Sequence, residues 1–157
     1  MEYFIPHRRE LTEEERGLLR FLLADDSVHA LQIDRLKVVA RCGCGQCPTI
    51  FSGKSLDAEP LTVSNATTGD IVADYFGLAK NGTTVGVTLH ERDGNLAELE
   101  ASVVFDGEIE GWPPTESLIP VRQAGRKLEG TMLLHEEQGR ATVIDLNSGD
   151  RPWWKFW

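Results

Sequence analysis

The architecture of this chain rests on residues 70–105, which read DIVADYFGLAKNGTTVGVTLHERDGNLAELEASVVF. Apolar and polar residues alternate along much of this segment, which is typical of β-strands with one buried face. The pair Asn81-Gly82 indicates a hairpin, because a type I′ turn requires positive φ at both central residues. The segment therefore predicts a three-stranded antiparallel meander.

The second turn of this meander, at Arg92-Asp93-Gly94, sets the register of the last two strands. A two-residue turn at Asp93-Gly94 would place Leu89 opposite Glu98, which buries a carboxylate or exposes a leucine. A three-residue loop with Gly94 in the left-handed conformation places Leu89 opposite Ala97 instead. We therefore expect the three-residue loop.

The first turn sets the faces of the first two strands. A two-residue turn at Asn81-Gly82 pairs Leu78 with Val85 and places Asp74 at the end of the apolar face. The apolar face is expected to pack on N-terminal helices. The opposite, polar face is expected to hold Tyr75, Thr88, His90, Glu98 and Glu100.

The polar face carries the candidates for acid–base chemistry. A histidine near a carboxylate and a phenol can transfer protons, so Tyr75, His90 and Glu98 are candidate site residues. Ordinary cross-strand polar pairs on a solvated sheet face explain the same residues without any activity.

Two short helices are predicted before the sheet. Thr12-Glu13-Glu14-Glu15 is a capping box, and leucines at helical spacing follow it. Asp25-Asp26-Ser27 ends this helix and can cap a second one. The fold class is therefore α+β, with two short helices packed on a mainly antiparallel sheet.

The length of 157 residues predicts a single domain. We divide it into a helical part (1–37), a sheet with the cysteine turn (38–111), and a C-terminal hairpin with an aromatic tail (112–157). The hairpin is expected to join residues 131–136 to residues 141–146 through Gln138-Gly139.

Composition excludes some classes of partner. Sixteen Lys and Arg against 25 Asp and Glu give a net charge of -9, which disfavours binding to nucleic acid. No apolar stretch is long enough to span a membrane. A soluble, cytoplasmic protein is expected, and the acidic charge suits a basic partner.

Three cysteines, Cys42, Cys44 and Cys47, lie within six positions. An odd number in one short run is not a disulfide scaffold, so we expect a reducing compartment. Cys44-x-x-Cys47 has the spacing of a zinc knuckle, and Cys42 adds a third candidate ligand. A fourth would come from His7, His29, His90, His135 or a carboxylate.

Two other interpretations of the cysteines stay open. Small thiols can simply pack in a glycine-rich turn. Alternatively, Cys44-Gly45-Gln46-Cys47 resembles a redox motif, but that chemistry usually places its first cysteine at a helix N-terminus. Here the residues after Pro48 indicate a strand, which is the wrong context.

The C-terminal tail is rich in aromatic residues. Tryptophans left in water would expose a large apolar patch, so the tail is expected to dock on the domain or to bind a partner or a second copy. The candidate contact residues are Trp153, Trp154, Phe156 and Trp157.

Several segments together resemble an uncharacterised family of small bacterial proteins. They are the Leu-rich helix after Leu11, the run Arg41–Thr49 with its Cys-Gly-Cys turn, the hairpin Val85–Glu100 with Leu-His-x-Arg-Asp-Gly, and Trp112-Pro113. The resemblance covers roughly residues 11–119. The resemblance implies no catalytic residues, but it implies that the cysteine turn and the hairpin are parts of the same structural unit.

These features predict a non-catalytic binding or interaction module with a cysteine metal site, zinc being the candidate metal. An acidic inhibitor or immunity protein for a basic partner is one alternative. A small enzyme that uses His90 and Glu98, or a metal bound by cysteines, is another.

Overall fold

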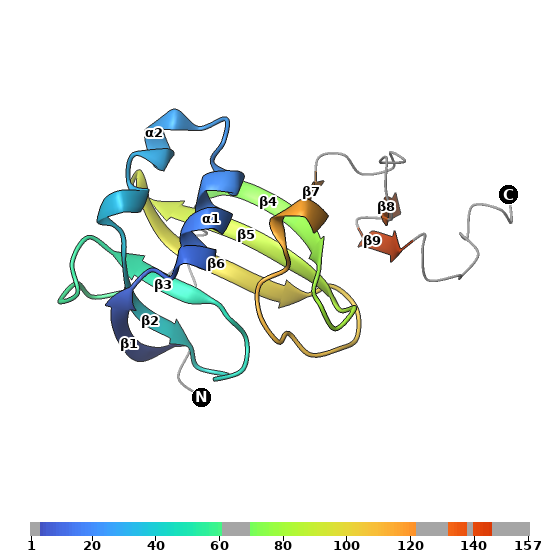
Figure 1. The fold of residues 1–157 in the computed structure, drawn as a ribbon, viewed down its shortest axis with the longest axis horizontal. Helices are drawn as coiled ribbons and strands as arrows, with labels where there is room; N and C mark the ends of the chain where they lie inside the picture. Colours follow the sequence, from blue (N-terminus) through green and yellow to red (C-terminus); the bar gives the residue numbers. More distant parts are fainter. Residues whose placement is uncertain (1–3, 61–69, 122–131, 138–139, 146–157) are drawn as a thin grey trace, which may run out of the picture. The chain divides into compact units, whose positions relative to one another are not determined.

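A computed structural model describes residues 4–60 and 70–121 of the chain and two further strands, β8 (Met132–Glu137) and β9 (Arg140–Asp145). The chain divides into two compact units, Met1–Leu118 and Ile119–Trp157. Helices and an antiparallel sheet form the first unit (Figure 1), so the predicted α+β class is confirmed. The single-domain assignment stays a prediction.

In the first unit the strands of the sheet follow the order β1-β2-β3-β6-β5-β4. The sheet contains the predicted meander, in which β5 lies between β4 and β6. The strands of this unit are β1 (Phe4–Glu10), β2 (Lys37–Cys42), β3 (Ile50–Gly53), β4 (Asp70–Leu78), β5 (Thr84–Arg92) and β6 (Asn95–Val103), and β7 (Ile119–Pro120) belongs to the second unit.

The helices begin as the sequence predicts. Helix α1 (Glu13–Leu22) has the capping box: Thr12 Oγ1 accepts the Glu15 amide at 3.1 Å, and the Glu15 carboxylate accepts the Thr12 amide at 2.9 Å. Asp26 caps the short helix α2 (Ser27–Ala30), and η1 (Ile33–Arg35) leads into β2. Among the described residues, no helix is both long and apolar enough to cross a bilayer.

The hydrophobic core lies between α1 and one face of the meander (Figure 1). Leucines on one side of α1 form a continuous cluster with apolar side chains from β5 and β6. The helix alone would expose these leucines to water, and packing on the sheet buries them. The cluster includes Leu18, Leu19, Leu22, Leu23, Val85, Val87, Leu89, Leu99 and Ala101.

The predicted register of the first hairpin is wrong by one residue. Leu78 lies opposite Thr84 rather than Val85, because the loop has three residues and closes between Ala79 and Thr83. Within it only Gly82 has positive φ, +85°. The Asn81 side chain accepts the Thr83 amide at 3.1 Å, so Asn81 stabilises the loop as an Asx turn rather than in the left-handed conformation.

The shift exchanges the faces of β4. Tyr75 pairs with Val87 on the helix-covered face, and its ring centroid lies 5.8 Å from that of Phe21. Asp74 pairs with Thr88 on the opposite, open face. The predictions that Tyr75 belongs to the polar face and Asp74 to the apolar face are therefore wrong.

The second turn is the one that the sequence analysis rejected. Arg92 pairs with Asn95, and the two turn residues between them have positive φ, 52° at Asp93 and 79° at Gly94. The register then shifts at a β-bulge, which places Leu89 opposite Leu99. Both leucines are buried, as expected, because the bulge rather than the turn corrects the alternation.

Two segments outside the meander differ from their predicted roles. The N-terminal strand β1 was not predicted, and it pairs with β2. Trp112, expected in a linker, is buried in the core with Leu118, and the Ser117 hydroxyl accepts the Leu78 amide at 3.0 Å. Strands β8 and β9 confirm the predicted C-terminal hairpin.

Candidate functional site

The cysteine turn connects two neighbouring strands. Cys42 is the last residue of β2, and the amide of Cys42 donates to the carbonyl of Thr49, just before β3, at 3.1 Å. The Gly45 amide donates to the Cys42 carbonyl at 3.2 Å, and Gly45 has a φ of +71°. Glycine adopts this conformation without strain, so the chain can reverse within a few residues.

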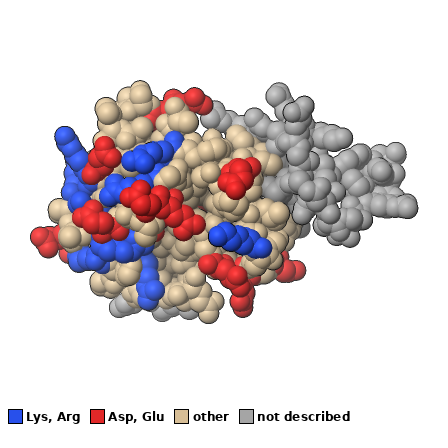
Figure 2. Space-filling view, in the orientation of Figure 1, with Lys and Arg blue, Asp and Glu red and all other residues tan. Residues whose placement is uncertain are grey.

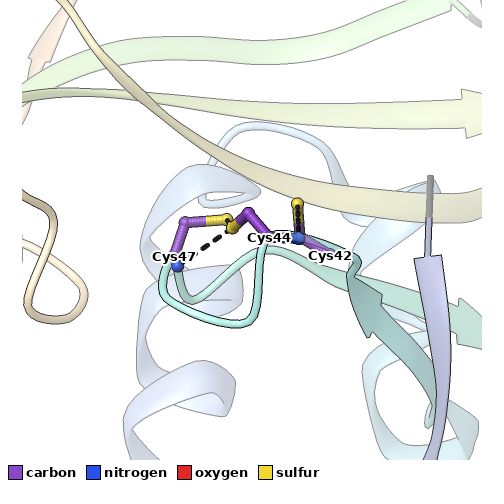
Figure 3. A group of neighbouring side chains, drawn as sticks. All are labelled: Cys42, Cys44 and Cys47. Atoms are coloured by element: carbon purple, nitrogen blue, oxygen red, sulfur yellow. Dashed lines mark hydrogen bonds between the residues drawn. The ribbon is translucent and has the colours of Figure 1, made fainter. Parts of the chain in front are cut away.

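The turn brings the three sulfurs together (Figure 3). The Sγ atoms of Cys42, Cys44 and Cys47 all lie within 4.8 Å of one another, and all three thiols are free. Cys44 and Cys47 are closest, with Sγ atoms 3.2 Å apart. Cys44 is exposed, whereas the other two are partly buried. The grouping that the sequence spacing suggested is present.

Backbone amides point at the sulfurs. The Cys47 amide donates to Cys44 Sγ at 3.4 Å, and the Cys44 amide donates to Cys42 Sγ at 3.5 Å. Hydrogen bonds from the backbone of Cys47 and Gln46 lower the pKa of Cys44 to about 7. Such activation usually comes from a helix N-terminus, but here the turn itself supplies the donors.

Cys42 behaves in the opposite way. Burial at the end of β2, together with the neighbouring thiols Cys44 and Cys47, raises the pKa of Cys42 to about 12. In the metal-free protein at neutral pH, Cys44 therefore ionises far more readily than Cys42. A metal ion bound to Cys42 would have to displace its proton.

The sulfur geometry fits a thiolate-bound metal. Tetrahedral zinc with bonds of about 2.3 Å places its sulfur ligands roughly 3.8 Å apart. Cys44 Sγ and Cys47 Sγ lie 3.2 Å apart and every pair lies within 4.8 Å, so small side-chain rotations suffice. Within the described part of the chain, the group of potential ligands consists of these three sulfurs.

The histidines considered as a fourth ligand have other surroundings. His7 Nε2 accepts a hydrogen bond from Arg9 Nε at 3.0 Å. His29 and His90 each contact carboxylates. The side chain of His135, on β8, lies outside the described residues. The structure therefore gives the cysteines no fourth protein ligand among the histidine side chains that it describes.

The open face of the meander holds a second polar group, which we call the His90 group: Asp74, Thr88, His90, Glu98 and Glu100. His90 lies opposite Glu98, and its Nε2 atom is 2.8 Å from Glu100 Oε2. Thr88 Oγ1 donates to Asp74 Oδ1 at 3.1 Å. Glu98 is only 3% exposed. Of the predicted acid–base residues, His90 and Glu98 lie together, and Tyr75 lies on the other face.

The charges of the His90 group are coupled. The hydrogen bond to Glu100 raises the pKa of His90, while the same contact lowers the pKa of Glu100. Burial raises the pKa of Asp74, although its bond from Thr88 acts in the opposite direction. The group therefore contains an ion pair between His90 and Glu100 and a half-buried carboxyl, Asp74, whose pKa is raised.

A third polar contact was not predicted. His29 on α2 lies between Asp26 and Glu91: its Nδ1 atom is 2.5 Å from Asp26 Oδ2, and its Nε2 atom contacts Glu91 Oε2. Although burial opposes it, these two bonds raise the pKa of His29. Asp26 is a local signal, three residues before His29, but Glu91 lies 62 positions away and only the fold brings it close.

The surface charge shows no single-sign field on the face in Figure 2, where basic and acidic side chains are interspersed. The predicted contact residues of the aromatic tail, Trp153, Trp154, Phe156 and Trp157, lie outside the described residues.

Comparison with known proteins adds no relative: no family model, curated protein or solved structure matches this chain. The resemblance to an uncharacterised bacterial family stays a prediction.

Proposed function

We propose that this protein is a metal-binding module, with zinc held by Cys42, Cys44 and Cys47. One observation supports it above all: three free sulfurs lie within 4.8 Å of one another on a single turn. Thiolate ligands favour thiophilic ions such as Zn²⁺ and Cu⁺ over Mg²⁺ or Ca²⁺.

The amide groups around the sulfurs support the same proposal. A metal requires thiolates, and a ring of thiolates repels itself unless positive charge or N–H donors face it. The Cys47 and Cys44 amides supply such donors to Cys44 Sγ and Cys42 Sγ. The turn therefore stabilises a thiolate at Cys44 before any ion binds, whereas Cys42 loses its proton when the metal binds.

Three sulfurs leave one corner of a tetrahedron for an outside ligand, such as water or a group from a partner. Cys44 is exposed, so a ligand from solvent or from a partner can reach this group of sulfurs. The role that follows is that of a binding module whose metal meets a partner, in which the His90 group takes no part.

The test is metal titration of the full chain, reduced and freed of metal. We expect one Zn²⁺ per chain, and with Co²⁺ an absorption band from sulfur-to-metal charge transfer. Cys44→Ser or Cys47→Ser should weaken binding by more than about 100-fold, since even the loss of an outer partner costs 10–100-fold. Gln46→Ala is the matched control, because Gln46 acts on the site through its backbone amide.

The proposal is wrong if the reduced chain binds less than one equivalent of every thiophilic ion tried. It is equally wrong if the two serine variants bind as tightly as Gln46→Ala. Circular dichroism of each variant establishes that the sheet is intact, so that lost binding is assigned to the site.

A further inference from the structure

The closest pair of sulfurs in the cysteine turn offers a second reaction. Cys44 Sγ and Cys47 Sγ are 3.2 Å apart, and two residues separate them in sequence, as in redox-active pairs. A disulfide needs its sulfurs only about 1.2 Å closer than this. Rotation of two side chains on a turn can supply that approach.

Disulfide formation and metal binding compete for the same atoms. A bound metal uses thiolates of Cys42, Cys44 and Cys47, whereas a disulfide between Cys44 and Cys47 removes two of them. The sulfurs of a disulfide are weak ligands, and Cys42 alone cannot retain zinc.

We propose that oxidation by a peroxide joins Cys44 to Cys47 and thereby releases the metal, so that metal binding by this module is under redox control. This inference rests on the proposed function and gives it a regulation. The order of events follows from exposure: Cys44 is the exposed thiol and its sulfur receives the Cys47 amide, so Cys44 meets the oxidant first.

The step balances with hydrogen peroxide as the oxidant. The Cys44 thiolate attacks one peroxide oxygen, the O–O bond breaks, and the departing hydroxide takes a proton to form water, leaving a sulfenic acid on Cys44. The Cys47 thiolate attacks that sulfur, the S–S bond forms, the S–O bond breaks, and a second water leaves. Two electrons pass from the two thiolates to the peroxide, and a thiol reductant reverses the change.

Cys42 takes no part in this reaction. It is the last residue of β2, where pairing with β1 and β3 fixes its backbone, and it is less exposed than Cys44. The same structure that makes Cys42 a good third ligand therefore keeps it out of the disulfide.

The experiment treats the full chain with hydrogen peroxide, with and without one equivalent of Zn²⁺. Free thiols are blocked, the disulfide is reduced, and the new thiols receive a second label that tandem mass spectrometry locates. A chromogenic chelator measures released zinc. We expect the second label on Cys44 and Cys47, the first on Cys42, and complete release of zinc that a dithiol reductant followed by fresh zinc restores.

Variants separate the pair from the third thiol. Without zinc, Cys42→Ser should still form the Cys44–Cys47 disulfide, whereas Cys44→Ser and Cys47→Ser should form any intramolecular disulfide at least about 10-fold more slowly, because each has lost one sulfur of the pair that lies 3.2 Å apart. A second label found mainly on Cys42, bonds only between chains, or zinc retained after oxidation would overturn the inference.

The zinc-free arm distinguishes the two proposals. A Cys44–Cys47 disulfide in a chain that binds no metal refutes the proposed function and the release of metal but leaves the pairing. Tight zinc binding that peroxide does not disturb supports the proposed function and refutes the redox control.

Discussion

The cysteine turn and the His90 group are both clusters of ionisable side chains on one sheet, yet they are stabilised in opposite ways. In the turn, backbone amides face the sulfurs, and the thiol with the lowered pKa, Cys44, is exposed. In the His90 group, side chains bond to each other: His90 to Glu100, and Thr88 to Asp74. The Cys44 thiol of the cysteine turn is accessible to a ligand from solvent, whereas side chains of the His90 group bond to one another within the fold.

This contrast has an energetic consequence. Backbone donors exist whether or not a ligand binds, so changing a cysteine alters binding more than folding. The His90 group buries charges that are compensated by their neighbours, so changing one member leaves the other without its partner and alters folding. Substitutions in the cysteine turn should therefore change metal binding, and substitutions in the His90 group should change stability.

The largest expected effect is the difference in reactivity between two thiols of the same turn. In the metal-free chain, alkylation of Cys44 should rise with pH around a midpoint of about 7, because backbone donors stabilise its thiolate. Cys42, whose pKa is about 12, should react more than about 100-fold more slowly near pH 7. Mass spectrometry of iodoacetamide-treated protein measures both rates.

One equivalent of zinc should protect Cys44 from the reagent. A Cys44 midpoint at the ordinary value of 9.0 would show that the amides do not activate the sulfur, and the contrast with the His90 group would lose its basis.

The next effect concerns the backbone of the turn. Gly45 has a φ of +71° and open space around its Cα, so Gly45→Ala adds strain of roughly 1–2 kcal/mol without a clash. We expect zinc affinity to fall about 10-fold, because the amides lose their alignment with the sulfur. Isothermal titration measures it. Gly111→Ala is the control, since Gly111 has open space and no positive φ; equal loss in both variants would contradict the role of the turn.

The sequence predicts the cysteine turn well because the turn is local. Spacing and glycine content within eight residues determine which sulfurs meet, and no distant contact is needed. The capping box at Thr12 and the burial of Leu89 were predictable for the same reason. Only the activation of Cys44 was missed, because the pattern says nothing of where amide groups point.

The His90 group was predicted less well because it depends on register. The three-residue loop that the Asn81 side chain stabilises moves the register of β4 by one residue, and the apolar pattern does not show this loop. Asp74 and Tyr75 exchanged faces as a result. The contact of His29 with Glu91 depends on where α2 meets the sheet, which no local signal sets.

A smaller effect concerns the ion pair in the His90 group. The folded-state pKa of His90 is raised above its ordinary 6.5, so its contribution is complete below pH 6.5 and is lost as pH rises through the raised value. The pKa of Glu100 is lowered, so its contribution is complete above its ordinary 4.5 and is lost as pH falls through the lowered value. The pair should therefore stabilise most between these two values.

Urea unfolding of the wild type and His90→Asn measures this contribution. We expect a loss of about 1 kcal/mol near pH 5.5, and a loss that shrinks as pH rises through the raised pKa of His90. Glu100→Gln should cost the same, and the double variant should cost little more than either alone. A change in zinc affinity in these variants would show that the two clusters are coupled.

The smallest effect concerns Asp74, the carboxyl that the wrong register had placed on the apolar face. Burial raises its pKa, and the bond from Thr88 Oγ1 partly opposes that shift. Thr88→Val keeps the β-branched shape that suits a strand but removes the donor, so the Asp74 pKa should rise further and stability should fall by about 0.5 kcal/mol at neutral pH. Because protonated Asp74 needs the donor less, the loss should shrink as pH falls through the raised pKa. Carboxyl NMR titration follows the pKa of Asp74 directly. Thr88→Ser retains the hydroxyl, so Asp74 in this control should titrate as in the wild type. An unmoved Asp74 pKa in Thr88→Val would mean that the side chains of the His90 group do not compensate one another, and the contrast with the cysteine turn would not hold for Asp74.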